Sequence, residues 1–267
     1  MSSSVFDVPV SLPRSAFSPR EAARAGDLWR LFQDVAVGGS IAAGWPPERY
    51  REEKVSFVVR SMTVIHHRET LYGEPLVGQT WPSRFRRGMF FRRECRVVGE
   101  AGPVASATQE WVHVTADVKL APASESLSSA FEVEEHGPPV QLPEIAPRQG
   151  GRVHRFELEC WHSWMDPLDH VNHPAYVDWA DEALARAMSA EGLDPVALSA
   201  VAEEARFSSG VNAREAVTVE TQLIGTTVDG AAAFSHRVAV GERACAKITT
   251  VRRLHGEQGE TALLALA

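Results

Sequence analysis

One short segment of the sequence brings together the residue types that attack on a carbonyl carbon requires. It reads Asp166-Pro-Leu-Asp-His170-Val-Asn172-His-Pro-Ala-Tyr176 and places a carboxylate, an imidazole and an amide close together. The Asp166 carboxylate could attack directly or act as general base for water, and a donor would have to hold the oxyanion that forms. Pro174 suits the first turn of a helix. We therefore expect the helix N-terminus from Asn172 to Ala175 to offer free backbone N–H groups as that donor, without a metal ion.

Each of these residues also has an ordinary structural interpretation. An aspartate ahead of a helix is usually a cap or turn residue, and His170 could order its loop through a hydrogen bond. Asn172 more often fixes a turn than contacts a substrate. Glu182, two turns into the expected helix, could lie near the site, although a solvent-facing carboxylate is the commoner arrangement on a helix with several acids.

A run of arginines is the second unusual feature of the sequence. It consists of Arg84, Arg86, Arg87, Arg92, Arg93 and Arg96. The plain interpretation is a solvated strand face with a turn, because most charge runs are solvated surface. The sharper interpretation is a docking patch for an acidic partner, formed by the first five of these arginines. The net charge of the whole chain is −8, which argues against nucleic acid as a partner.

Composition fits an ordinary soluble globular protein. The chain has 267 residues, of which 44% are hydrophobic and 23% are charged. No stretch approaches the roughly 18 uncharged apolar residues of a membrane span, and the N-terminus lacks the features of a signal peptide. Cys95, Cys160 and Cys245 are scattered, without the spacing of a disulfide framework or a zinc site. We expect a cytoplasmic protein with no cofactor, no metal and no membrane partner.

The elements that must position the Asp166 segment occur twice along the chain. Each half has a strand-like run, a loop, one long helix and then further strands. Apolar residues at helical spacing predict helices over Asp27–Gly44 and Pro174–Gly192, each ending at a glycine. Alternating Thr, Val, Phe and Trp residues predict the strands. These strands cover residues 5–10, 55–66, 76–81, 89–98 and 104–114 in the first half, and 154–161, 216–227, 232–240 and 244–254 in the second.

The repeat predicts an α+β fold with a tandem helix-on-sheet architecture. Two long central helices would pack on antiparallel sheets, and the two sheets would pair side by side as a pseudo-dimer. We place the first domain at residues 1–120 and the second at 152–267, joined by a linker at 121–151 that is rich in Pro, Ser and Glu. Aligning the helix ends sets Ser18 opposite Asp166 and Ala22 opposite His170. The first half is therefore expected to have no catalytic acid.

The Asp166 segment resembles the loop and helix of hotdog thioesterases. Segments of the first half are similar to the N-terminal domain of plant and bacterial acyl-ACP thioesterases, in the family's order along most of the chain. These segments are Phe57-Val-Val-Arg60, Gly73-Glu-Pro-Leu-Val-Gly-Gln-Thr80-Trp81-Pro82 and Gln109-Glu-Trp111-Val112. The resemblance implies a double hotdog that hydrolyses an acyl thioester on acyl carrier protein, as a monomer or a homodimer. It also implies an acyl-chain pocket in the first half.

Residue by residue, the resemblance is incomplete. The family's active site uses an Asp, an Asn two residues later and a His two residues further, and here Asp166 and His170 match while Leu168 replaces the Asn. A Glu-Cys pair on a later strand falls near Val211 and Asn212, where neither group is present. A non-hydrolytic acyl-thioester binding protein therefore stays open as an alternative. An acyl-CoA thioesterase also stays open, because it differs from the leading interpretation only in carrier recognition. We predict Asp166 and His170 as catalytic residues, and substrate contacts from Asn172, His173, Tyr176, Glu182 and Asn212.

Overall fold

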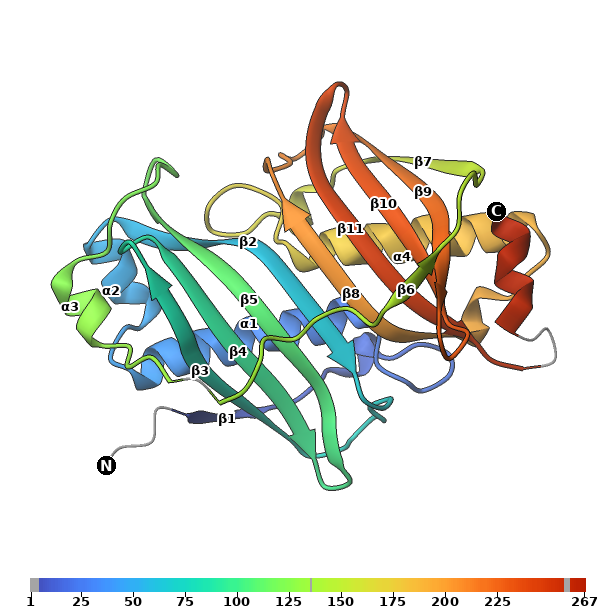
Figure 1. Ribbon diagram of the computed structural model, residues 1–267. Coiled ribbons are helices and arrows are strands. Elements are labelled where there is room, and N and C mark those ends of the chain that lie inside the picture. The colour runs from blue at the N-terminus through green and yellow to red at the C-terminus, as the bar shows by residue number, and fades with distance from the viewer. Residues whose placement is uncertain (1–4, 135, 257–259) are drawn as a thin grey trace. The chain divides into compact units, whose positions relative to one another are not determined.

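A computed structural model describes residues 5–134, 136–256 and 260–267. The chain divides into two compact units (Figure 1). The first contains the residues up to Arg14 and Leu28–Gln141, and the second contains Ser15–Asp27 and Leu142–Ala267. Each unit consists of an antiparallel sheet with one long helix.

The first unit has five strands in the order β1-β3-β4-β5-β2. The strands are β1 (Phe6–Val10), β2 (Val55–His66), β3 (Leu76–Arg86), β4 (Phe90–Gly99) and β5 (Gly102–Thr115). The helices are α1 (Ala25–Ala42), α2 (Pro47–Glu52) and α3 (Glu125–Ser129), and the first residues of α1, up to Asp27, are counted with the second unit. A 3-10 turn, η1 (Arg14–Ala16), begins at the last residue of the first segment of this unit. Neighbouring strands are antiparallel throughout.

Helix α1 lies on the sheet because its apolar residues recur at helical spacing. Trp29, Phe32 and Val35 are fully buried on this face. The helix approaches the sheet closely at Gly78, where a Cβ atom would lie 2.1 Å from the Val35 side chain. The sheet also holds the helix through Gln109, whose Nε2 donates to the Phe32 carbonyl at 3.3 Å.

The second unit repeats this plan with strands in the order β8-β11-β10-β9-β6, and β7 also pairs with β9. Its strands are β6 (Ile145–Pro147), β7 (Val153–Glu159), β8 (Leu198–Phe207), β9 (Ala216–Thr227), β10 (Ala232–Val240) and β11 (Arg243–Leu254). The long helix is α4 (Pro174–Ala190). Short 3-10 turns are η2 (His162–Trp164), η3 (Pro195–Ala197) and η4 (Glu260–Leu266).

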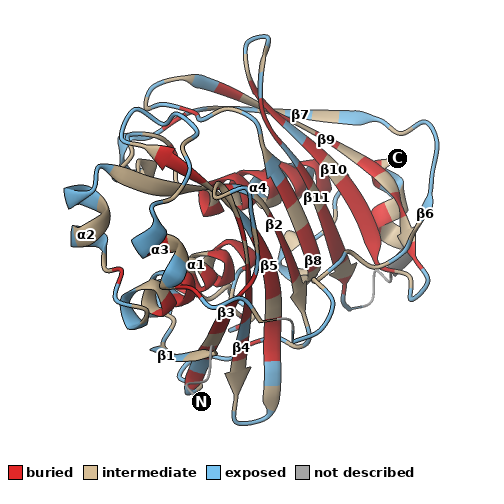
Figure 2. Ribbon diagram, turned by 60° about the vertical axis from the view of Figure 1, so that its left-hand side comes forward, coloured by how far each residue is buried: buried red, intermediate tan, exposed pale blue. Residues whose placement is uncertain are grey.

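The core of the second unit lies between α4 and its sheet. Leu184 and Met188 of α4 pack against Leu223 and Phe234, all of them almost fully buried. Figure 2 shows buried residues along α4 and along β9, β10 and β11. A buried arginine, Arg252 of β11, adds a polar tie, because its guanidinium bonds to Asp181 of α4 at 2.7 Å and to Glu203 of β8.

Each sheet also buries a short polar row beneath its helix. In the first unit, Cys95 Sγ donates to Thr80 Oγ1 at 3.2 Å. In the second, the two ring nitrogens of His236 lie 2.9 Å from the hydroxyls of Thr221 and Thr250. Thr80 pairs with Cys95 across β3 and β4, as Thr221 pairs with His236 across β9 and β10, so the two rows are equivalent.

The structure confirms the predicted α+β class and the helix-on-sheet unit that occurs twice. Strands β2, β9 and β10 have the bounds predicted from the sequence. The sequence prediction was wrong to omit β8, whose Ala- and Glu-rich sequence favours a helix, since pairing with β11 overrides that preference. The pairing of the two sheets as a pseudo-dimer stays a prediction.

The segment expected to be a plain linker packs on the first unit over much of its length. It contains α3, and the Ala123 N–H bonds to the Gly88 carbonyl at 2.7 Å. Further along, the Val140 N–H bonds to Thr108 Oγ1 at 2.7 Å. Irregular backbone of this kind gives no periodic signal in the sequence, because isolated hydrogen bonds rather than a repeated face hold it in place. Within the described part of the chain, no helix combines the length and apolar character that crossing a bilayer requires.

Candidate active site

The loop ahead of α4 is a closed turn that ends where the helix begins. A β-bridge joins Met165 to Val171, and the Asp166 N–H bonds to the His170 carbonyl at 2.8 Å. Asp169 takes a left-handed conformation with φ of 59°, which short polar residues tolerate better than most. Pro174 occupies the first turn of α4, as predicted.

Asp166 and His170 form a pair inside this loop. His170 Nδ1 lies 3.2 Å from Asp166 Oδ2, and the side chains keep 21% and 14% of their surface exposed, respectively. The other carboxylate oxygen, Oδ1, accepts the Leu168 N–H at 2.8 Å. With a proton on Nδ1, the imidazole donates to Asp166 and leaves Nε2 for another group. The pair is thus held in place and still open to solvent.

A second loop, residues 208–215 between β8 and β9, lies against this pair. The Val171 N–H bonds to the Val211 carbonyl at 2.9 Å. A Cβ atom added to Gly210 would lie 3.2 Å from His170 Cβ, so a glycine permits this close approach. The Val211 N–H in turn bonds to the Tyr176 hydroxyl at 3.1 Å, which ties the loop to α4.

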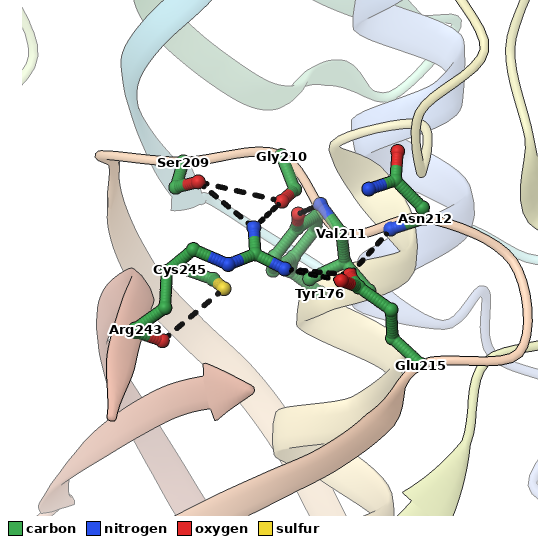
Figure 3. A network of polar contacts seen from close by, with 8 residues as sticks. All are labelled: Tyr176, Ser209, Gly210, Val211, Asn212, Glu215, Arg243 and Cys245. Atoms are coloured by element: carbon green, nitrogen blue, oxygen red, sulfur yellow. Dashed lines mark hydrogen bonds and ion pairs between the residues drawn. The ribbon is translucent and has the colours of Figure 1, made fainter. Parts of the chain in front are cut away.

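An ion pair fixes the shape of loop 208–215. Arg243 Nη2 lies 2.6 Å and 2.7 Å from the two carboxylate oxygens of Glu215, so one guanidinium nitrogen contacts both oxygens (Figure 3). Arg243 Nη1 bonds to Ser209 Oγ at 2.9 Å and to the Gly210 carbonyl. Partial burial opposes the charge on Glu215, but the Asn212 N–H and Arg243 outweigh it and keep the pKa of Glu215 below its usual value.

The sequence prediction missed Arg243, Glu215 and Gly210. The two charged residues are far apart in the sequence, and neither stands in a recognisable motif. Their roles depend on the pairing of β8 with β11, and the sequence prediction had omitted β8. A signal that could have found them is the Gly210-to-Glu215 turn segment, which lies close to the position expected for the family's second pair of polar residues.

The positions of Tyr176 and Glu182 bear on two predicted substrate contacts, and only that of Tyr176 is corrected. Tyr176 is only 2% exposed, and its hydroxyl is engaged by Val211, so it positions the loop rather than contacting substrate. Burial raises the pKa of the Tyr176 phenol above its ordinary value. Glu182 is exposed on α4 and pairs with Arg186 at 2.7 Å, and its contact with substrate stays a prediction. Carboxylates on a helix surface commonly form such a pair with a basic residue four positions along.

The expected row of free backbone N–H groups at the start of α4 is also corrected. The Asn172 N–H bonds to the Trp164 carbonyl at 2.9 Å, and the Ala175 N–H bonds to the Asn172 carbonyl at 3.0 Å. The tight first turn thus satisfies donors that were expected to face a substrate. The predicted contacts of Asn172, His173 and Asn212 with substrate stay predictions. The Asn212 side chain is exposed, and the His173 ring meets Phe207 edge-on, with centroids 6.0 Å apart.

The arginine run separates into two groups in the structure. Arg93 is only 8% exposed, lies over the Phe131 ring and bonds to Thr80, so its predicted docking role is wrong. Burial lowers the pKa of its guanidinium. The other four predicted docking arginines line one pocket of about 240 Å³ in the first unit, together with Arg60, which the sequence prediction did not include. They are Arg84, Arg86, Arg87 and Arg92.

No group of His, Cys, Asp and Glu side chains within the described residues has the arrangement of a metal site. The three cysteines are free and buried. Burial raises the pKa of Cys95 to about 12 and that of Cys160 to about 11, so their thiols stay protonated and weakly nucleophilic near neutral pH. Burial also raises the pKa of Cys245, so none of the three thiols is suited to act as a nucleophile near neutral pH.

Comparison with known proteins agrees with this architecture. A family model described as the thioesterase-like superfamily matches residues 160–256, which confirms the resemblance of the Asp166 segment to that superfamily. None of the curated proteins with which the sequence was compared matches it.

Three solved structures share the fold over nearly the whole chain. A protein described as an oleoyl thioesterase from Lactobacillus plantarum has a TM-score of 0.80 and 19% identity, covering 95% of this chain and 97% of that one. A 12:0-ACP thioesterase from Umbellularia californica has a TM-score of 0.76 and 13% identity, with 94% and 95% covered. An acyl-ACP thioesterase from Bacteroides thetaiotaomicron has a TM-score of 0.72 and 12% identity, with 94% and 98% covered. The tandem hotdog fold is therefore shared, as predicted.

Proposed function

We propose that the protein is a thioesterase that hydrolyses an acyl thioester, with Asp166 as the catalytic carboxylate. The observation that carries this proposal is the Asp166–His170 pair, at 3.2 Å in a closed but solvent-accessible loop. The superfamily match over residues 160–256 includes this loop. An aspartate in such a position can take a proton from water as the water attacks a carbonyl carbon.

The reaction then consumes one water molecule, and Asp166 carries the proton from that water to the leaving group. Asp166 Oδ2 accepts a proton while the water oxygen bonds to the thioester carbon, and a tetrahedral oxyanion forms. When the C–S bond breaks, the thiolate leaves and recovers the proton from Asp166. The products are a carboxylic acid and a thiol. His170 keeps the carboxylate oriented through Nδ1, while Leu168 N–H holds Oδ1.

For the carrier, we propose acyl carrier protein, with the substrate a fatty or related acyl chain. Arg84, Arg86 and Arg87 are exposed on a chain whose net charge is −8, so they form a local basic surface suited to an acidic partner. Two of the proteins that share the fold are described as ACP thioesterases. We further propose that the first half, residues 1–120, shapes the acyl-chain pocket and that residues 152–267 supply the chemistry, with 121–151 between them.

The test is thiol release from a panel of acyl-ACP and acyl-CoA thioesters by the wild type and by Asp166→Asn. Asparagine keeps an oxygen for the Leu168 N–H but cannot accept the proton from water. We expect turnover by the wild type, faster with ACP than with CoA, and a loss of about 100- to 10,000-fold in the variant. Binding of acyl thioesters without turnover in the wild type would instead favour a non-hydrolytic binding protein, the function that Leu168 in place of the family's Asn keeps open.

A further inference from the structure

The arginines of the basic pocket in the first unit come from four separate parts of its sheet. Arg60 comes from β2, Arg84 and Arg86 from the end of β3, Arg87 from the turn, and Arg92 from β4. Phe90, Phe91 and Trp111 supply aromatic surface, and Glu110 is the acidic residue of the lining. Five guanidinium groups therefore share one pocket with a single carboxylate.

Few of these charges are neutralised by the protein itself. Arg92 lies 3.3 Å from Glu94 and donates to Ser83 Oγ at 2.9 Å. Within the residues that the structure describes, the other four arginines of the pocket form no ion pair. Glu110 accepts a hydrogen bond from Ser61 at 3.1 Å instead. The pocket thus retains an excess of positive charge that an anion would balance.

Two features of the hairpin between β3 and β4 cost stability in the free protein. Arg84 lies directly opposite Arg92 in the strand register, and like charges at such positions repel each other. Arg87 takes a left-handed conformation with φ of 53° at the first position of the turn, where Asn or Gly is usual. Strain of this kind tends to gather at functional positions, which supports a functional role for Arg87.

Equivalent positions in the second unit show whether the sheet needs these arginines in order to form. The β2 strand has a bulge at Arg60, and β8 has the equivalent bulge at Val201. The register pair Arg84–Arg92 corresponds to Gly225–Ala233 in the second unit. The same backbone irregularities therefore form without arginine, and the basic residues of the first unit are not needed to fold the sheet.

We propose that this pocket binds a phosphate ester. Several guanidinium groups match a multiply charged phosphate, because each can donate two parallel hydrogen bonds to its oxygens. The adjoining Phe90 and Trp111 rings can cover the uncharged part of such a ligand. Identifying the phosphate as that of a pantetheine carrier arm, present both on a carrier protein and in coenzyme A, rests on the proposed thioesterase function. Binding of the anion itself does not.

The test is isothermal titration calorimetry on the full chain, with inorganic pyrophosphate as the first probe. We expect saturable binding by the wild type and at least tenfold weaker binding by the triple variant Arg60→Gln, Arg84→Gln, Arg86→Gln. A matched control removes three exposed arginines of the second unit: Arg155→Gln, Arg206→Gln, Arg237→Gln. No binding by the wild type, or an equal loss in the control, would overturn the proposal.

Further titrations identify the source of the phosphate. Phosphopantetheine binding without pantetheine binding would assign the pocket to the carrier arm, whereas 3′,5′-ADP binding as tight as coenzyme A would assign it to a nucleotide. If carrier protein lacking its prosthetic group binds and no phosphate compound does, the pocket recognises an acidic protein surface and the proposal is wrong. The affinity of Asp166→Asn for each phosphate compound should equal that of the wild type. A loss of hydrolysis can then be distinguished from a loss of phosphate binding.

Discussion

Two loops of this chain, 17–23 before α1 and 165–171 before α4, have the same backbone and different side chains. A β-bridge closes each loop at its ends. In each, the N–H of the second residue bonds to the carbonyl of the sixth, at 2.9 Å in the first loop and 2.8 Å in the second. The fifth residues, Glu21 and Asp169, have φ angles of 61° and 59°. The backbone of the loop is therefore a property of the fold and not of the chemistry.

The side chains separate the structural role of Asp166 from its proposed catalytic role. Ser18 Oγ accepts the Arg20 N–H at 3.3 Å, just as Asp166 Oδ1 accepts the Leu168 N–H. A hydroxyl is thus enough to make the turn. The second carboxylate oxygen of Asp166, and the imidazole that contacts it, have no counterpart in the first loop. Forming the turn does not require either group, so both are available for a catalytic role.

Replacing His170 by alanine copies the first loop, where the equivalent residue is the buried Ala22. We expect the variant to fold, and kcat to fall by about 100-fold, because the carboxylate loses the group that orients it. KM should stay within about twofold, since the substrate contacts remain. Steady-state kinetics with circular dichroism as a folding control would check this. A kcat close to that of the wild type would remove His170 from the mechanism.

Loop 208–215 offers a second way to weaken the site without touching Asp166 or His170. In Arg243→Gln, the loop loses the ion pair between Arg243 and Glu215, and we expect turnover to fall by about tenfold as Gly210 and Val211 move. Amide hydrogen exchange within the loop should become faster. Arg206→Gln, which removes an exposed arginine, is the matched control. Equal exchange rates in both variants would show that the ion pair does not hold the loop.

Of the two buried polar rows, only that of the second unit contains a histidine, His236, and we expect it to make the free energy of unfolding depend on pH. Burial, with Arg252 adding to it, lowers the pKa of His236 to about 3, so the folded state keeps this ring neutral. The unfolded chain protonates it near its ordinary value of about 6.5. The unfolding free energy should therefore fall as the pH drops from about 6.5 toward 3, and this group contributes no slope above that range. The equivalent Cys95, with a pKa of about 12, stays neutral throughout.

Urea unfolding of the wild type and His236→Gln at several pH values would measure this effect. Glutamine keeps one donor and one acceptor for the two threonine hydroxyls but does not titrate. The variant should lose less stability than the wild type between about pH 7 and about pH 5. Parallel curves for the two proteins would mean that His236 is not the titrating group.

Transferring the pair to the first loop should have the smallest effect. In Ser18→Asp, Ala22→His, the shared backbone can hold both side chains, but hydrolysis also needs the surroundings of the second loop. We expect the turnover number to equal that of the wild type, measured with the same acyl thioester. A clear gain in activity would show that the pair alone is sufficient for hydrolysis.

The two long helices and the equivalence of the two loops could be predicted from the sequence. The residues that line the pocket could not, because they are brought together by pairing between strands that are distant in sequence. Periodicity gave both long helices, and the spacing placed Ser18 and Ala22 opposite Asp166 and His170, as the hydrogen bonds of the two loops now show. Arg60 joins the pocket from a strand distant in sequence, through a bulge that no local pattern reveals. Arg93 and Arg92 are neighbours in sequence but alternate between the buried and accessible sides of β4, so a charge run alone could not separate them.

The central claim is that the carboxylate of Asp166 carries hydrolysis, and Asp166→Ser tests it most directly. Serine already makes this turn at position 18, so the variant should fold with the same stability and differ only in chemistry. Thiol release from the best acyl-ACP substrate should fall by about 1,000-fold or more relative to the wild type. A folded Asp166→Ser variant that releases thiol within about tenfold of the wild-type rate would contradict the assignment of this loop as the active site.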